Sequence, residues 1–171
     1  FSFTTTGTLN DTDVVDGGTG TDSLTVTNGA ATLTPNVENV ENLIITPTGN
    51  MTVNLANTAS TFSKLELASG GAFNLVLNDV AAIPGVLKLT NSSGDLTLNL
   101  KAAAVAGTSD VVAIELAGAQ TDSTITITDD SATAAIEGVT IHSGAAANIL
   151  TDLTGARGSI TVTGDQSLTL T

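Results

Sequence analysis

The stretch "TFSKLELASGGAFNLVLNDVAAI", residues 61–83, contains the pattern that decides the fold. Apolar and polar residues alternate in "SKLEL", apolar residues occupy every second position of "FNLVL", and a glycine-bearing turn separates the two segments. A period of two that is rich in Leu and Val is the signature of a β-strand. The stretch therefore predicts a strand, a short turn, a second strand and a connector of small residues.

Blocks of the same design recur along the chain. They begin at Glu41, Thr61, Pro84, Ser109 and Ile136, and a partial block begins at Ser159. Each block contains a turn glycine, at Gly49, Gly70 or Gly71, Gly94, Gly118, Gly144 and Gly164. Repeats at steps of roughly 20–26 residues are typical of solenoids, in which each block covers the apolar side of its neighbour.

Stacked blocks would place equivalent side chains in rows, about 4.8 Å apart. We expect one inward row of Leu67, Leu89 and Leu116, and a second inward row of Leu55, Leu77 and Leu100. The outward positions of the first sheet are then Glu66, Lys88, Glu115 and Thr140, whose alternating charges favour this pairing. The outward positions of the second sheet are Thr52, Asn54, Asn74, Thr97, Asn99, Thr124 and Thr126.

The composition favours the same architecture. The chain is 41% hydrophobic but only 2% aromatic, with no Trp and no Tyr, which suits a thin core between two facing sheets. Helical periodicity is nearly absent, and its best windows are residues 35–43 and 102–107. We predict an all-β fold, a parallel β-solenoid resembling a β-helix or β-roll, with roughly 22-residue rungs of two short strands. A β-sandwich is the alternative, because it also uses many short strands.

The charge balance is strongly acidic, with 17 Asp and Glu against four Lys and Arg, for a formal net charge of −13. This balance excludes nucleic-acid binding, which needs a positive surface, and makes insertion into anionic membranes unfavourable. The absence of cysteine excludes disulfides and thiolate metal sites. We see no signal peptide and no run of ~20 apolar residues that would cross a membrane, and we expect a fragment of a larger chain.

Residues 17–25, "GGTGTDSLT", match the calcium-binding nonapeptide G-G-x-G-x-D-x-U-x. Glycines allow tight turns that direct carbonyl oxygens to one point, and a carboxylate adds the hard oxygen ligand that Ca²⁺ prefers. The preceding stretch, residues 7–16, resembles a degenerate copy. The candidate Ca²⁺ ligands are Asp11, Asp13, Asp16, Gly18, Gly20 and Asp22. The alternative is that these residues form only Asx turns and a hairpin tip.

The calcium motif followed by "VENVENL", residues 37–43, resembles bacterial surface-layer (S-layer) proteins and related repeats-in-toxin (RTX) surface proteins. The resemblance rests on motifs in residues 7–46 and on general style beyond them. It implies a secreted protein of the extracellular bacterial cell surface, exported by type I secretion, which binds calcium and assembles into a coat. It divides the chain into calcium-binding turns and first strands at 1–34 and a β-solenoid stack at 35–171, within one continuous domain.

The sequence therefore predicts a structural protein whose calcium-dependent self-assembly forms an S-layer lattice. Its expected partners are copies of itself and a cell-surface glycan or lipopolysaccharide. The alternative is a stalk or ligand-binding module of a large secreted RTX adhesin, with the Thr/Asn surface as its contact face.

We expect no enzymatic activity. His142 is the single histidine, so a site built from several histidines cannot form, and we predict that His142 lies on the surface. A polysaccharide lyase with a parallel β-helix is a further alternative. The strands, however, contain few of the Arg, Lys, Tyr and Trp residues that commonly line sugar-cleaving grooves.

Overall fold

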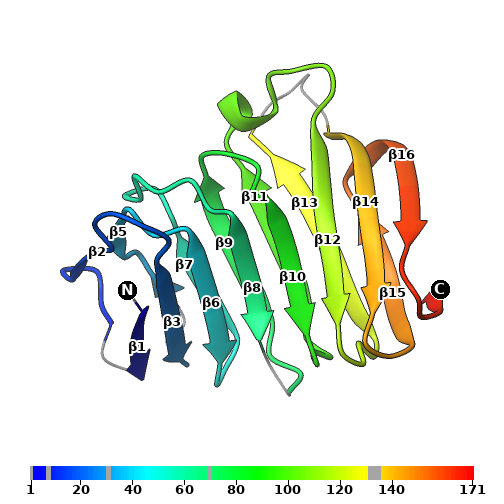
Figure 1. The fold of residues 1–171 in the computed structure, drawn as a ribbon, viewed down its shortest axis with the longest axis horizontal. Coiled ribbons are helices and arrows are strands. Elements are labelled where there is room, and N and C mark those ends of the chain that lie inside the picture. The colour runs from blue at the N-terminus through cyan, green and yellow to red at the C-terminus, as the bar shows by residue number, and fades with distance from the viewer. Residues whose placement is uncertain (1, 7–8, 30–31, 69–70, 131–135) are drawn as a thin grey trace.

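A computed structural model describes residues 2–6, 9–29, 32–68, 71–130 and 136–171 (Figure 1). These residues form an all-β structure with parallel sheets and without an α-helix. Gly70, one of the predicted turn glycines, lies outside the described residues.

Two large sheets contain most of the strands. The first sheet has the order β1 (Ser2–Thr6), β3 (Ser23–Asn28), β6 (Asn42–Pro47), β8 (Lys64–Ala68), β10 (Val86–Thr90), β12 (Val111–Ala117), β14 (Ile136–Gly144) and β16 (Ala156–Thr163). The second sheet has the order β17 (Leu168–Leu170), β15 (Asn148–Thr154), β13 (Ser123–Asp129), β11 (Leu96–Leu100), β9 (Leu75–Val80), β7 (Met51–Asn54) and β4 (Thr32–Leu33). A small third sheet pairs β2 (Val14–Asp16) with β5 (Asn36–Glu38).

From β6 onward the chain alternates between the first and second sheets, so strands that pair are separated by one strand of the other sheet. Figure 1 shows the first-sheet strands side by side across the whole molecule, from the N-terminal to the C-terminal colours. The pairings of both large sheets and of the small sheet are parallel. Parallel pairing differs from the antiparallel pairing of the sandwich alternative and is compatible with a β-solenoid.

Register partners in the first sheet follow the repeat of the blocks. Leu43, Leu65 and Leu87 are partners at 22-residue steps. Leu87, Ile114 and Ile141 are partners at 27-residue steps, because longer connectors enter the later blocks. One of these connectors contains the single described 3₁₀ helix, η1 (Ala102–Val105).

The first predicted inward row is confirmed. Leu89 pairs with Leu67 on one side and with Leu116 on the other, and none of the three is more than 1% exposed. Burying a leucine side chain stabilises the fold by roughly 1.5–3 kcal/mol. Such rows, repeated across both sheets, form the core.

The second predicted inward row is wrong in register, although its three leucines are buried. Leu77 pairs with Val53 and Leu98, whereas Leu100 pairs with Val80. Leu55 follows the end of β7, where its N–H donates to the Asn78 carbonyl at 2.9 Å. The cause is an irregularity in β9, where Asp79 adopts a φ of 58° and adds one residue between the inward positions.

Neither of the two weak helical windows forms an α-helix. Residues 36–38 form strand β5, and Asn39 then turns the chain with a φ of 52°. Val37 and Val40 are both buried because they lie on either side of this corner, which produces a helix-like spacing without a helix. In the second window, residues 102–105 form η1, which is too short to be an α-helix of the core.

Candidate functional site

The predicted calcium ligands lie in the acidic turn, residues 9–22, which connects β1 to β3 through β2. The N–H of Gly17 donates to the Glu38 carbonyl at 2.9 Å, where a side chain at position 17 would meet the backbone oxygen of Asn39 at 2.0 Å. Gly18 and Gly20 have φ values of 82° and 120°. Glycine at these positions is therefore required for the turn itself, as the motif predicts.

Two of the carboxylates hold backbone groups of this turn and its neighbour. Asp11 accepts a hydrogen bond from the Thr34 N–H at 2.6 Å. Asp13 accepts two from Asn10, from its N–H and its side-chain amide, both at 2.9 Å. Asp13 therefore fixes the backbone within the turn, and Asp11 connects the turn to the backbone of the next block.

Asp16 is held in the same way. It accepts hydrogen bonds from the Asn39 side-chain amide at 2.8 Å and from the Gly18 N–H at 2.9 Å. These two donors lower the pKa of the exposed Asp16 carboxyl below its ordinary value, with the Asn39 bond contributing most. Asp16 therefore connects the small third sheet to the start of the glycine turn.

Asp22 differs from the other three because it is fully buried, at 0% exposure. Its N–H donates to the Glu41 carboxylate at 2.7 Å, and its carbonyl accepts from the N–H groups of Glu41 and Asn42. The same arrangement recurs at Asp110, whose N–H donates to Glu137 at 2.7 Å and whose carbonyl accepts from Glu137. Each of these hydrogen-bonded Asp–Glu pairs joins successive blocks just before a first-sheet strand.

The described residues do not bring three or more Asp, Glu, His or Cys side chains together in a way that could hold a metal. As placed, Asp11, Asp13, Asp16 and Asp22 do not share one site. The calcium ligands stay a prediction from the motif.

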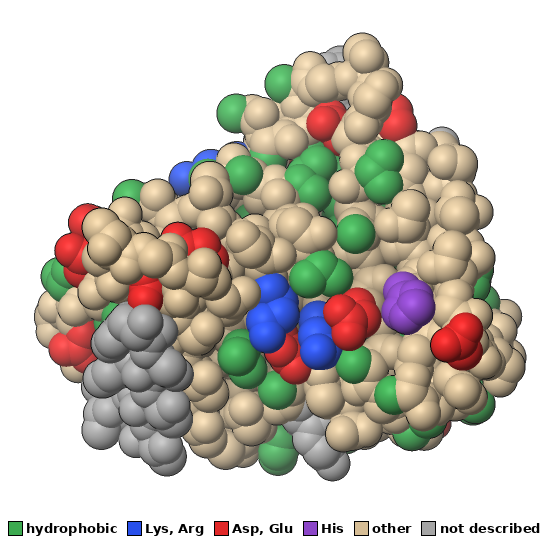
Figure 2. Space-filling view, viewed as in Figure 1, with side chains coloured by type: hydrophobic (Ala, Val, Ile, Leu, Met, Phe, Trp, Pro, Cys, Tyr) green, Lys and Arg blue, Asp and Glu red, His purple; other side chains and the backbone are tan. Residues whose placement is uncertain are grey.

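A charged row crosses the outside of the first sheet. Its members are Glu66, Lys88, Glu115 and His142, which are register partners on β8, β10, β12 and β14. The predicted order of Glu66, Lys88 and Glu115 is confirmed. Thr140 is not in this row, because it pairs with Ala113 two positions away and His142 takes the expected place. Figure 2 shows these charges and the histidine together near the centre of one face.

Two ion pairs involve residues of the charged row. Lys64 Nζ lies 2.9 Å from the Glu66 carboxylate, and Lys88 Nζ lies 3.5 Å from that of Glu115. Burial raises the pKa of Glu66, but the hydrogen bonds from Thr90 and Lys64 together with the nearby lysine charges give a net lowering. His142 is exposed, as predicted.

The Asn/Thr face covers the outside of the second sheet. One row contains Thr52, Val76, Thr97, Thr126 and Thr154, and a second contains Asn54, Asn78, Asn99 and Thr128. The Asn99 amide donates to Asn78, and the Thr128 hydroxyl donates to Asn99. Two predicted members lie elsewhere in register: Asn74 precedes β9 and accepts from the Asp95 N–H, and Thr124 pairs with Asp152.

Sequence reasoning missed the polar corner, a set of buried polar residues where the chain passes between the sheets. Its members are Ser92, Gln120, Ser123, Ser143 and Asn148, all at most 1% exposed. Gln120 accepts from the Ser92 N–H at 3.0 Å and donates to the Leu89 carbonyl at 3.1 Å, and its N–H donates to Asn148. The sequence feature that could have revealed the polar corner is a regular spacing, because Ser92, Gln120 and Asn148 occur at 28-residue steps.

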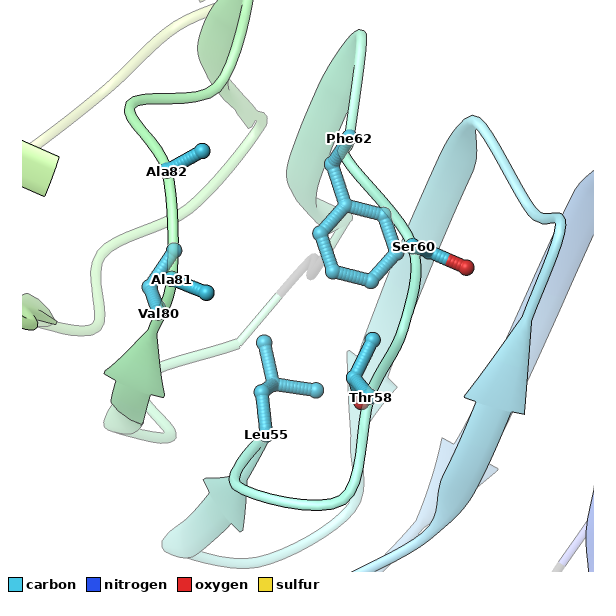
Figure 3. A pocket seen from close by; sticks show the side chains of 7 residues that line it. All are labelled: Leu55, Thr58, Ser60, Phe62, Val80, Ala81 and Ala82. Atoms are coloured by element: carbon cyan, nitrogen blue, oxygen red, sulfur yellow. The ribbon is translucent and has the colours of Figure 1, made fainter.

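A small cavity lies between the connectors that follow β7 and β9. Figure 3 shows its lining, which consists of Leu55, Thr58, Ser60, Phe62, Val80, Ala81 and Ala82. Its volume is about 10 Å³. A space of that size holds about one water molecule and no organic substrate.

Among the described residues, the structure contains no helix with the length and hydrophobicity needed to span a bilayer. Comparisons with protein-family models, with curated proteins and with solved structures each gave no match to the chain.

Proposed function

We propose that the chain is a β-solenoid with rungs of roughly 22 residues, and that it is a structural protein of the extracellular bacterial surface that assembles into an S-layer lattice. A rung here means one first-sheet strand together with the second-sheet strand that follows it. The observation that carries the proposal is the unbroken parallel order of both sheets through the molecule.

The burial of apolar side chains between stacked blocks supports a structural role for the protein. A single block cannot bury its apolar side, whereas stacked blocks bury continuous rows such as Leu65, Leu87 and Ile114. Stability in such stacks comes largely from contacts between neighbouring repeats, and the result is an elongated body with flat outer faces. Flat faces that repeat at the strand spacing suit side-by-side contacts between identical molecules.

The sequence motif of residues 17–25 is the basis for expecting calcium binding. We expect one or two Ca²⁺ sites in the acidic turn, with ligands among Asp11, Asp13, Asp16 and Asp22 and the carbonyls of Gly18 and Gly20. Isothermal titration with CaCl₂ measures this binding, with Asp11→Asn combined with Asp16→Asn as the test variant. A titration of the unmodified chain that gives no heat of binding contradicts the calcium part and leaves the structural part standing.

Electron microscopy of the purified protein with CaCl₂ and with EGTA tests the structural part. We expect ordered sheets in calcium that disperse in the chelator. A protein that stays dispersed at high concentration in both conditions contradicts assembly. Ordered sheets that persist in the chelator contradict only the dependence on calcium.

A second candidate function is a glycan-binding module of a large secreted adhesin, and the Asn/Thr face favours it. Its hydroxyl and amide groups are aligned in hydrogen-bonded rows and carry no charge. A glycan array tests this function, with Thr97→Lys on the Asn/Thr face and Thr25→Lys on the outside of the first sheet as the matched control. Binding that Thr97→Lys removes and Thr25→Lys retains supports it, and an array without binding contradicts it.

A further inference from the structure

The centre of the outer face of the first sheet carries balanced charge in a strongly acidic molecule. The charged row crosses it, and Figure 2 shows these charges together on this face. Lys64 and Lys88 are two of the four bases of the chain, and they pair here with Glu66 and Glu115, two of its 17 acids. In a chain with a net charge of −13, this is a region that a second copy can approach with little electrostatic repulsion.

This part of the face is also flat. The side chains of Lys64, Lys88 and Glu66 are 26%, 23% and 9% exposed, so they lie along the sheet and not out into solvent. The row two positions further along the strands consists of small residues, which are Ala68, Thr90, Ala117 and Gly144. In the same view, Figure 1 shows the connectors leaving β8, β10 and β12 at the strand ends. A second flat surface can therefore come close to this face.

The order of the charged row is complementary to its own reverse. From β8 to β14 the register partners are Glu66, Lys88, Glu115 and His142. When a second copy of the row is laid over the first in the opposite direction, Lys88 faces Glu115 and Glu66 faces His142. An imidazole donates a hydrogen bond to a carboxylate and is attracted to it when protonated. Each acid of the row then faces a basic side chain.

We propose that a second copy of this chain packs the outer face of its first sheet on the same face of the first copy, related by a two-fold axis. The axis lies in the interface, runs parallel to β10 and β12, and passes between Lys88 and Glu115. It reverses the row, so Lys88 of each copy faces Glu115 of the other. A two-fold axis along the row would place each residue opposite itself, and like charges facing each other are unfavourable. The contact uses the same surface on both copies and closes as a dimer.

The row of small residues fits the same axis. Thr90 and Ala117 are register partners on β10 and β12, so the axis places Thr90 of one copy opposite Ala117 of the other. Ala68 and Gly144 lie one strand further out on either side and likewise face each other. Sheets that pack face to face lie about 10 Å apart. Side chains of this size leave room for that approach.

The inference rests on the proposed structural function, since it names one face used in lateral assembly. Light scattering coupled to size exclusion, from 1 to 200 µM protein, measures the mass. We expect 16.9 kDa for the unmodified chain at the lowest concentration and an approach to twice that mass as the concentration rises. Lys88→Glu and Glu115→Lys should each raise the dissociation constant at least tenfold, because each places like charges across the axis. The two substitutions combined restore opposite charges and should recover most of the lost affinity.

These variants separate the two-fold contact from a general effect of charge. Lys88→Glu and Glu115→Lys change the net charge in opposite directions, so general repulsion predicts opposite effects, whereas the proposed contact predicts the same effect. The matched control is Lys101→Glu, which changes the net charge as Lys88→Glu does. Lys101 follows β11 of the second sheet, where its N–H donates to the Val80 carbonyl, and this variant should dimerise as the unmodified chain does.

Four results overturn the interface. They are a monomeric unmodified chain at 200 µM, single reversals that have no effect or opposite effects, a double variant that does not recover, and a Lys101→Glu variant that weakens the dimer as much as Lys88→Glu. Circular dichroism of each variant verifies that its β-sheet content is unchanged.

Cross-linking of the unmodified chain gives a measurement that no variant can disturb. An equal mixture of isotopically light and heavy copies at 200 µM is treated with a carbodiimide, which joins an amine directly to a nearby carboxylate. After proteolysis, mass spectrometry should find Lys88 linked to Glu115 between a light and a heavy copy. Links within single copies only would overturn the contact.

Failure of this contact is distinguishable from failure of the S-layer function. Ordered sheets in the microscope without this dimer leave the function standing and place the contact elsewhere. A dimer in solution without ordered sheets contradicts the function and leaves the contact standing.

Discussion

Glu66 shows how one side chain combines burial with charge. It is 9% exposed, accepts the Thr90 hydroxyl at 2.7 Å and lies 2.9 Å from Lys64 Nζ. The opposing effects leave its pKa below the ordinary value of 4.5, so the folded state favours the ionised carboxylate. The stabilisation is present above that ordinary value and is lost as the pH falls through the lower pKa of the folded state.

We therefore predict that Glu66→Gln flattens the acid side of the stability profile and lowers stability at neutral pH. Urea unfolding between pH 3 and 7 measures both effects. The control is Glu115→Gln in the same charged row, where the carboxylate is 37% exposed and 3.5 Å from Lys88. Exposed ion pairs contribute about 0–1 kcal/mol, so this control should change stability little at pH 7. An acid profile for Glu66→Gln that matches the unmodified chain would contradict the role of this residue.

The charged row also shows which register positions can be predicted from the sequence. Alternating charge is enough to align Glu66, Lys88 and Glu115, because opposite charges in register are favourable and like charges are not. Counting outward positions between the inward rows assigns the next place to Thr140, but that place belongs to His142. Glu115 and His142 each lie six residues after the start of their block, at Ser109 and Ile136, whereas Thr140 lies four residues after it.

At the scale of elements, the polar corner is the feature that joins the sheets of successive blocks. Gln120 connects the Ser92 N–H, the Leu89 carbonyl and the side chain of Asn148, all in buried surroundings. A buried N–H or carbonyl that loses its partner costs about 1–3 kcal/mol. The corner therefore fixes the register between blocks more tightly than apolar packing alone, since a shifted register would leave these groups unpaired.

Gln120→Ala should accordingly lower the free energy of unfolding by about 1–3 kcal/mol, because it leaves buried backbone groups without a partner. Chemical denaturation measures the change. Gln166→Ala is the matched control, because Gln166 is exposed and its backbone N–H, which the substitution retains, donates to the Ser143 carbonyl. Equal effects of the two substitutions would show that the corner does not carry this energy.

Strand β9 and the acidic turn contain features that the sequence alone does not predict. The first inward row is predictable because inward apolar residues recur at every second position of β8, β10 and β12. The second is not, because Asp79 at a φ of 58° inserts a residue into β9 and nothing in the alternation reveals it. In the acidic turn, the glycine positions are predictable from backbone geometry. Whether a carboxylate there binds a metal or a backbone N–H depends on distances that the motif does not contain.

Across the whole molecule, negative charge greatly exceeds positive charge. The net charge is −13, and the described ion pairs Lys64–Glu66 and Lys88–Glu115 involve only two of the 17 acids. Mutual repulsion of surface carboxylates destabilises a compact state and is screened by salt, with a Debye length of about 10 Å at 0.1 M. Stability should therefore increase with ionic strength.

We predict that raising NaCl from 0.02 to 0.5 M increases the thermal midpoint by several degrees, since about 1 kcal/mol corresponds to 2–4 °C for a chain of this size. Differential scanning calorimetry measures the shift, and a midpoint that falls or stays constant would contradict self-repulsion as a destabilising term. CaCl₂ and MgCl₂ at the same ionic strength separate screening from binding. Screening alone gives equal midpoints for the two salts. A specific Ca²⁺ site in the acidic turn adds a further increase in calcium only, which Asp11→Asn with Asp16→Asn should remove, because a ligand that binds only the folded state stabilises it.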